Sequence, residues 1–249
     1  MSLASPASVL PSPVRTDPLA RMLAWAGHGA FTVAATLLVV LHLDPDWGGG
    51  KDPVTAMLSE YALTPGHWAW ALALTLTSAG SVAVLVSLRR TGVLAGAAAP
   101  AWLAVWCVAI ALVAVFSKDP QGGAVSLTGK LHLYATGVSC AALPVAGLVL
   151  ARTHRAHPSW HRFARWSRWL ALTSVPFFLP FIVPFAVHVL LSRGFPTPAT
   201  GLVERIMAGL ELALLALLGG WAHHASRPTV HTGHPAEISQ ADQREQVVP

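Results

Sequence analysis

Charged side chains are scarce in this chain of 249 residues: Asp, Glu, Lys and Arg together make up 11% of the sequence, whereas 54% of it is hydrophobic. A soluble domain carries about a quarter charged residues, and apolar stretches of about 20 residues are typical of membrane-spanning helices. The composition therefore excludes an ordinary soluble domain. It predicts an all-α integral membrane protein.

Cysteine is also nearly absent. The two cysteines, Cys107 and Cys140, lie in apolar segments, where a cysteine usually packs as a small hydrophobic residue, so a disulfide framework is excluded. The chain contains no phosphate-binding loop, no Gly-x-Ser-x-Gly elbow and no dinucleotide fingerprint. The net charge is +5, but no basic run interleaved with aromatic residues lies on a polar, foldable segment, so nucleic acid is not an expected partner. The cofactor stays unknown.

Six apolar stretches are long enough to cross the hydrocarbon core of a bilayer. They cover roughly residues 22–43, 67–88, 92–116, 131–151, 169–192 and 201–223. We therefore expect a six-helix transmembrane domain over residues 21–223. The segments 1–20 and 224–249 are too rich in proline or in polar residues to pack, and we expect them to be disordered cytoplasmic tails.

The distribution of basic residues predicts the orientation of these spans. With both termini in the cytoplasm, most of the 16 lysines and arginines lie on the cytoplasmic side, including the five arginines of residues 152–168. Cytoplasmic loops are enriched in lysine and arginine. The pattern thus predicts a multi-pass protein of the cell membrane whose neighbours are membrane lipids; a homo-oligomer is left open.

The first outer loop, residues 44–66, is long for a connection between helices. Its apolar residues Val54, Met57, Leu58 and Tyr61 recur with helical spacing, which predicts a short amphipathic helix at the end of the bundle. The alternative is a lid over a site that opens outward. In that case Glu60 and Tyr61 would contact a substrate.

The second outer loop places Asp119 at the end of the third span and His132 at the start of the fourth. A carboxylate beside an imidazole can orient it as a base or supply two metal ligands. A zinc site needs three or four ligands, so no metal site is predicted from these two residues alone. The other explanation is a hydrogen-bonded turn that fixes the helical hairpin.

The last span begins with Glu204 and Arg205, and Glu211 follows Glu204 by seven residues, close to two helical turns. Both glutamates therefore lie on one face. Glu211 is expected near the bilayer midplane, where an ionised carboxyl is costly. It is either a functional group or a neutral acid hydrogen-bonded to another helix.

The fifth span carries three prolines at intervals of four residues, Pro176, Pro180 and Pro184, which favour a kink. His188 continues the same face toward the outer surface. A kinked helix of this kind can line a cavity, because its freed carbonyl groups need partners. A simply curved helix fits the same pattern.

Five blocks of this sequence resemble the bacterial six-span family catalogued as domain of unknown function 998, over roughly residues 20–222. The blocks are Asp52-Pro53, Ser59-Glu60-Tyr61, Phe116-Ser117-Lys118-Asp119-Pro120, Gly129-Lys130-Leu131-His132 and Gly201-Leu202-Val203-Glu204-Arg205-Ile206. The resemblance implies a six-helix fold and marks Asp119, His132, Glu204 and Arg205. A looser likeness to the six-span Frag1/DRAM/Sfk1 proteins points toward lipid handling.

Three functions remain open. The first is an intramembrane hydrolase, transferase or cyclase acting on a lipid or isoprenoid, with acid/base or metal chemistry at Asp119, His132 and Glu204 and an anion contact from Arg205. A terpene-cyclase-like variant starts from a protonated carboxyl such as Glu211. The second function is a transporter, sensor or lipid-binding scaffold that uses Glu204 and Glu211 as a polar relay. The third is purely structural. Whether the chain is an enzyme is left open.

Overall fold

The computed structural model describes residues 17–120, 124, 126–191 and 200–227; for residues 181–191 it describes the backbone alone. Most of the two predicted tails lies outside this range. Over the described residues all regular structure is helical. The elements are α1 (Pro18–Leu43), α2 (Pro45–Gly48), the 3-10 helix η1 (Leu58–Leu63), α3 (His67–Arg90), α4 (Ala98–Val115), α5 (Leu127–Thr153), α6 (His161–Leu191) and α7 (Thr200–Ala225).

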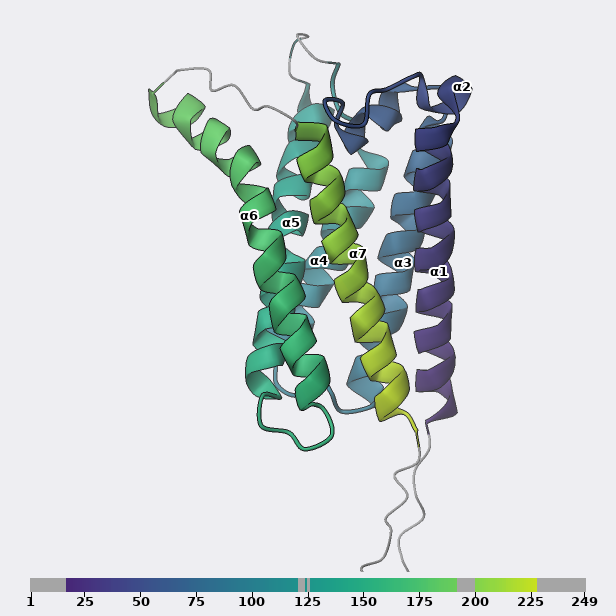
Figure 1. The fold of residues 1–249 in the computed structure, drawn as a ribbon, viewed down its shortest axis with the longest axis vertical. Helices are drawn as coiled ribbons and strands as arrows, with labels where there is room; N and C mark the ends of the chain where they lie inside the picture. Colours follow the sequence, from purple (N-terminus) through teal and green to yellow (C-terminus); the bar gives the residue numbers. More distant parts are fainter. Residues whose placement is uncertain (1–16, 121–123, 125, 192–199, 228–249) are drawn as a thin grey trace, which may run out of the picture. The chain divides into compact units, whose positions relative to one another are not determined.

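The six long helices form a closed ring within the unit Asp17–Ser226 (Figure 1). Each long helix packs against the next one in the sequence, and α7 closes the ring against α1. One end of the bundle carries α2, η1, the loop between α4 and α5, and the start of α7. We call it the η1 end. The opposite end carries the loops 91–97 and 154–160, and we call it the arginine end.

Four of the described helices are long and apolar enough to cross a membrane, namely α1, α3, α4 and α5. Large hydrophobic side chains along them, such as Val33, Val108, Val115 and Leu133, are exposed in the isolated chain. An apolar surface of this kind is suited to lipid contact and unsuited to water. The helices and their exposed surfaces support the prediction of a multi-pass membrane protein.

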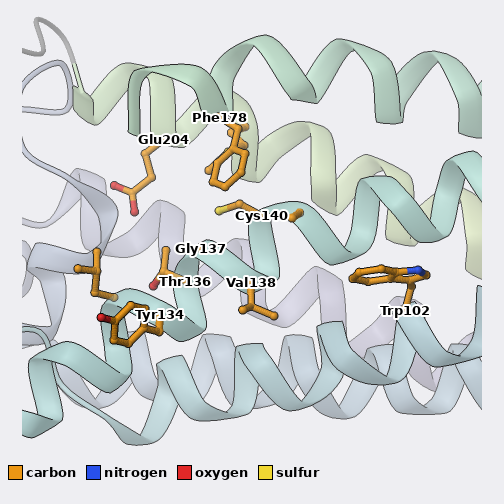
Figure 2. A pocket seen from close by; sticks show the side chains of 11 residues that line it. Trp102, Tyr134, Thr136, Gly137, Val138, Cys140, Phe178 and Glu204 are labelled. Carbon is orange, nitrogen blue, oxygen red and sulfur yellow. The ribbon is translucent and has the colours of Figure 1, made fainter. Parts of the chain in front are cut away.

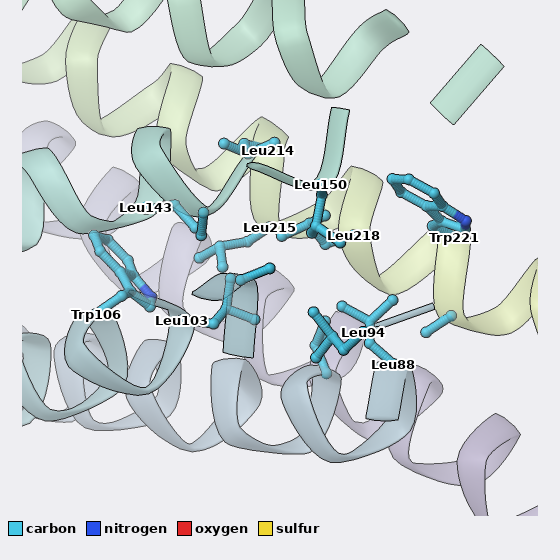
Figure 3. Close-up of a cluster of buried hydrophobic side chains, with 14 of the residues drawn as sticks. Leu88, Leu94, Leu103, Trp106, Leu143, Leu150, Leu214, Leu215, Leu218 and Trp221 are labelled. Carbon is cyan, nitrogen blue, oxygen red and sulfur yellow. The ribbon is translucent and has the colours of Figure 1, made fainter. Parts of the chain in front are cut away.

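The interior of the ring is filled mainly by leucine and alanine side chains, together with Trp106 and Trp221. Figure 3 shows Leu143 and Leu150 of α5 facing Leu214 and Leu218 of α7, with Trp221 at the arginine end. Close approach of helices also contributes: at Gly80 of α3, a Cβ atom would lie 2.8 Å from the Phe31 ring of α1. Small residues at such crossings let two helices pack closely in a membrane.

The predicted start of the third span at residue 92 is wrong, because α4 begins only at Ala98. Gly92 and Gly96 adopt φ values of 77° and 76°, in the left-handed region that favours glycine. These two residues turn the chain between α3 and α4. The fourth helix begins earlier than residue 131, at Leu127, since the Ser126 side chain caps it by accepting a hydrogen bond from the Gly129 amide at 3.0 Å.

The first outer loop contains a short helix, but a 3-10 helix and not a regular amphipathic α-helix. Leu58 and Tyr61 are buried, as their spacing predicts, whereas Val54 is 44% exposed and precedes η1. Glu60 is buried together with them. The side of η1 that packs on the bundle therefore carries both apolar residues and a charged one. An amphipathic pattern predicts only apolar residues on that side.

Candidate functional site

The first turn of α7 is fastened to the loop before η1. The Leu202 amide donates to the Val54 carbonyl at 3.0 Å, and the Leu58 amide donates to Oε2 of Glu204 at 2.6 Å. The first amides of a helix have no partner within the helix, and the loop supplies one here. Glu204, separated from Leu58 by 146 positions in the sequence, thus holds η1 in place.

Arg205 connects three parts of the chain. Its Nη1 donates to the carbonyls of Ala56, at 2.6 Å, and Gly201, at 2.9 Å, while Nη2 donates to the Tyr61 hydroxyl at 3.3 Å. Its Nε donates to Nε2 of His42 in α1. The guanidinium group therefore binds the protein itself in this structure. Contact of Arg205 with a substrate anion stays a prediction.

His42 was not among the predicted site residues, although it lies at the centre of this cluster. Its Nδ1 lies 2.6 Å from the Leu38 carbonyl, which can only accept a hydrogen bond. Nδ1 therefore carries the proton, and Nε2 is free to accept from Arg205. The ring is neutral in this arrangement. A single histidine in an apolar helix does not indicate such a contact in the sequence, because its partner Arg205 lies 163 positions farther along the chain.

Glu60 is buried between two lysines at the η1 end. Its carboxylate lies 3.2 Å from Nζ of Lys51 and 3.9 Å from Nζ of Lys118, and it accepts from the Met57 amide at 3.3 Å. Burial lowers the pKa of Lys118, whereas the negative charges of Glu60 and Glu204 oppose that shift. Lys118 thus brings a positive charge toward both glutamates, Glu60 and Glu204.

Asp119 and His132 form hydrogen bonds with different partners. Asp119 accepts from the backbone amide and from the hydroxyl of Ser126, both at 2.7 Å, and so supports the N-terminal cap of α5. His132 is buried, and its Nδ1 donates to the Phe116 carbonyl at 2.7 Å. Both contacts hold together the turn between α4 and α5. They agree with the structural alternative for Asp119 and His132, a hydrogen-bonded turn that fixes the helical hairpin. A catalytic role for either residue stays a prediction.

The Asp119 contacts predict a pH dependence of stability. The hydrogen bonds from the Ser126 side chain and backbone hold the pKa of Asp119 below its usual value. A carboxyl whose pKa is lower in the folded state stabilises it above the unfolded pKa, about 3.9, and that contribution is lost as the pH falls through the folded pKa. We expect the wild type to lose more thermal stability than Asp119→Asn between pH 5 and pH 3, measured as Tm in detergent. Equal losses would contradict this prediction.

Glu211 lies on the same face of α7 as Glu204 and is 7% exposed. Its Oε1 is buried without a hydrogen-bond partner among the described residues. Hydroxyl groups of α3 and α5 form hydrogen bonds with other partners: Ser78 donates to the Cys107 carbonyl and Ser139 to the Thr136 carbonyl. A buried polar atom without a partner costs free energy, so packing alone does not explain the carboxyl at this position.

A cavity of about 500 Å³ lies beside Glu204, between α5, α6 and α7, and α4 contributes one residue, Trp102, to its lining (Figure 2). Figure 2 shows Glu204 at one end and the Trp102 ring at the other. Apart from Glu204 the lining is mostly apolar and aromatic: Trp102, Leu133, Tyr134, Thr136, Gly137, Val138, Cys140, Ala141, Phe178 and Met207. Met207 lies between Glu204 and Glu211 on α7, so the α7 wall of the cavity leads toward the buried acid.

The structure brings together Glu60, Tyr61, Glu204 and Arg205 around η1 and leaves Asp119 at the exposed start of α5. The side chain of His188 and the predicted kink residue Pro184 lie outside the described side chains. Among the side chains that the structure describes, no group of three or more His, Cys, Asp or Glu residues gathers as a metal site would require. The geometry places the carboxyl of Glu204 in the lining of a mostly apolar cavity.

A family model described as "Protein of unknown function (DUF998)" matches residues 30–221. The chain belongs to this family. The family predicted from the sequence blocks is thus confirmed, and the match extends from α1 into the last turns of α7. No curated protein and no solved structure matches the chain. The family description gives no activity.

Proposed function

We propose that this chain is an enzyme of the cell membrane that binds a lipid or isoprenoid chain in the cavity between α5, α6 and α7 and acts on it by acid/base chemistry. The observation that carries the proposal is an apolar cavity of about 500 Å³ with the carboxyl of Glu204 at one end. Ligand sites commonly combine a largely apolar lining with few polar groups that fix orientation.

The topology that we propose has six spans with both termini in the cytoplasm. Helix α6, with 31 residues, and α7, with 26, complete the ring begun by the four candidate spans. At 1.5 Å per residue, 26 residues extend about 39 Å, more than the hydrocarbon thickness of about 30 Å. The five arginines of residues 152–168 support a cytoplasmic location of the arginine end. The cavity then opens toward the outer leaflet.

We assign a different role to each polar or aromatic group near the cavity. Glu204 faces the cavity and acts as the general acid or base on a polar group of the ligand. Glu211 does not line the cavity but lies one helical turn beyond the lining residue Met207, and it would start a cyclisation by protonating an isoprenoid double bond that reaches it. Trp102 lies at the other end of the cavity, where an indole ring stabilises positive charge. Asp119 and His132 remain candidates for further acid/base steps.

Filling the cavity tests the proposal. A Cβ atom at Gly137 would meet no atom within 4 Å, so Gly137→Leu places its side chain in the cavity without a clash against the backbone. We expect the occupancy of a co-purifying lipid or isoprenoid, detected by native mass spectrometry and lipid extraction, to fall at least about tenfold, because the leucine side chain occupies the space of the ligand.

The matched control is Gly209→Leu. Gly209 is also in a helix with open space around it, it is exposed, and it does not line the cavity. Both variants gain the same helix propensity, so a difference between them reports the cavity. If the wild type and both variants carry the same mixture of bulk lipids, the cavity selects no ligand and the proposal fails.

The second candidate is a transporter, sensor or lipid-binding scaffold without catalysis. It is favoured by the placement of Glu204 and Glu211 two turns apart on one face of α7, which suits a polar relay. Incubating the purified protein with its extracted ligand separates the two functions. Conversion of the ligand by the wild type and not by Glu204→Gln supports the enzyme, whereas an unchanged ligand that both bind supports the scaffold.

A further inference from the structure

A second cavity, of about 590 Å³, lies at the arginine end between α5 and α6. It is separate from the candidate site and shares none of its lining residues. The polar part of its lining is entirely basic: Arg152, Arg155, His161, Arg165 and Arg168. The proposed function leaves this cavity unused.

The four arginines point to a ligand with negative charge. On α5 the lining residues recur with spacings of three and four, and so do those on α6, so each helix presents one face to the cavity. Among the described residues, none of the four guanidinium groups forms a hydrogen bond or a salt bridge with a carboxylate. Several like charges gathered without a counterion favour binding of an anion.

The apolar part of the lining indicates where that anion comes from. Arg155 lies in the loop 154–160 and His161 directly follows this loop, whereas Leu148 and Leu172 lie farther along the helices toward the middle of the bundle. Leu148 is about 8 Å from Thr153, the last residue of α5, along the helix axis. Trp169 is exposed on the same face, at a depth where indole rings anchor to the lipid interface. Charge at the end and apolar surface toward the midplane match a phospholipid.

We propose that the cavity at the arginine end binds the phosphate of an anionic glycerophospholipid, whose acyl chains lie along Leu148, Trp169 and Leu172. Arginine holds phosphate oxygens through paired N–H donors, and basic cavities between spans on the cytoplasmic side recognise such headgroups. The bound lipid joins α5 to α6 at the end opposite the candidate site. The site is independent of the proposed function, because it uses none of the residues of the first cavity.

The test is a titration of the full chain, stripped of lipid in detergent, with phosphatidylglycerol or with phosphatidylcholine in mixed micelles. Adduct formation is followed by native mass spectrometry and by Tm. We expect phosphatidylglycerol to bind and to raise Tm. Phosphatidylcholine should neither form an adduct nor change Tm. The double variant Arg152→Gln/Arg168→Gln should bind phosphatidylglycerol at least about tenfold more weakly.

The matched control is Arg89→Gln/Arg162→Gln, which removes the same two charges. Arg162 is exposed on α6 and Arg89 on α3, and neither lines the cavity. Retained affinity in this control supports the site, whereas an equal loss in both double variants shows general surface attraction and overturns it. Equal binding of the two lipids by the wild type overturns it as well.

Two further readings complete the test. Inorganic pyrophosphate that displaces phosphatidylglycerol completely and binds as tightly would identify a soluble phosphate site and would also overturn the proposal. Unchanged Tm of both variants in phosphatidylcholine micelles shows that they fold, because the four arginines are exposed and hold no described contact. If the Tm of the double variant Arg152→Gln/Arg168→Gln falls, the titration is repeated with the single variants Arg155→Gln and Arg165→Gln.

Discussion

Replacing Arg205 with methionine is expected to lower the free energy of unfolding by about 3 kcal/mol, because charge-assisted hydrogen bonds are lost and carbonyl oxygens are left without donors. Arg205 holds the Ala56 carbonyl, the Tyr61 hydroxyl and the His42 ring, which belong to the loop, to η1 and to α1. Thermal unfolding in detergent, followed by tryptophan fluorescence, measures the change.

Two substitutions complete this experiment. Arg205→Lys keeps the charge but has no planar fork, so it should recover only part of the stability. Arg162→Met removes an exposed arginine of α6 that has no described partner, and its Tm should stay within error of the wild type. A stable Arg205→Met protein with an ordered loop would show that Arg205 is free to contact a ligand.

Replacing Glu211 with methionine is expected to raise the free energy of unfolding by about 1–3 kcal/mol, the cost of burying a polar atom without a partner. Methionine has a similar length and adapts to irregular space, so the packing around α7 is retained. The same variant should be inactive if Glu211 supplies the proton in the proposed chemistry. Gain of stability with loss of function is typical of a residue kept for its chemistry.

Glu211→Gln is the control, because an amide of the same shape still leaves a buried polar group. Its Tm should differ little from that of the wild type. A Glu211→Met protein that is less stable than the wild type by 2 kcal/mol or more, an amount typical of a lost buried contact, would mean that the carboxyl has a strong partner beyond the described side chains. Glu211 would then be a structural residue. It could not serve together with Glu204 as a polar relay along α7.

Hydropathy and length predicted the helices because a bilayer requires about 20 apolar residues per span, and this requirement is visible in the sequence. Their ends were predicted less well. Ala98 begins α4 because Gly92 and Gly96 turn the chain, and hydropathy does not separate an apolar loop such as Val93-Leu94 from a helix. Leu127 begins α5 because Ser126 caps it, which a window average does not detect.

Some residues of the candidate site could be identified from the sequence. Glu204, Arg205, Glu60 and Tyr61 could be found because charged residues next to apolar spans need a reason to be there, and the structure places all four around η1. The residues that line the cavity could not be found from the sequence. Tyr134, Gly137 and Val138 lie on one face of α5, but a lipid-facing stripe and a cavity wall have the same composition. Only the packing of α6 and α7 distinguishes them.

The closed ring has a consequence for biosynthesis. α1 leaves the ribosome first and α7 last, yet the two pack against each other, and η1 depends on Glu204 and Arg205 of α7. Helices α1 and α3 can pair early, as Gly80 allows, but the loop before η1 has no anchor until the final helix is inserted. Chains truncated before residue 200 should therefore enter the membrane and be removed by quality-control proteases, because the unanchored loop remains open to cleavage.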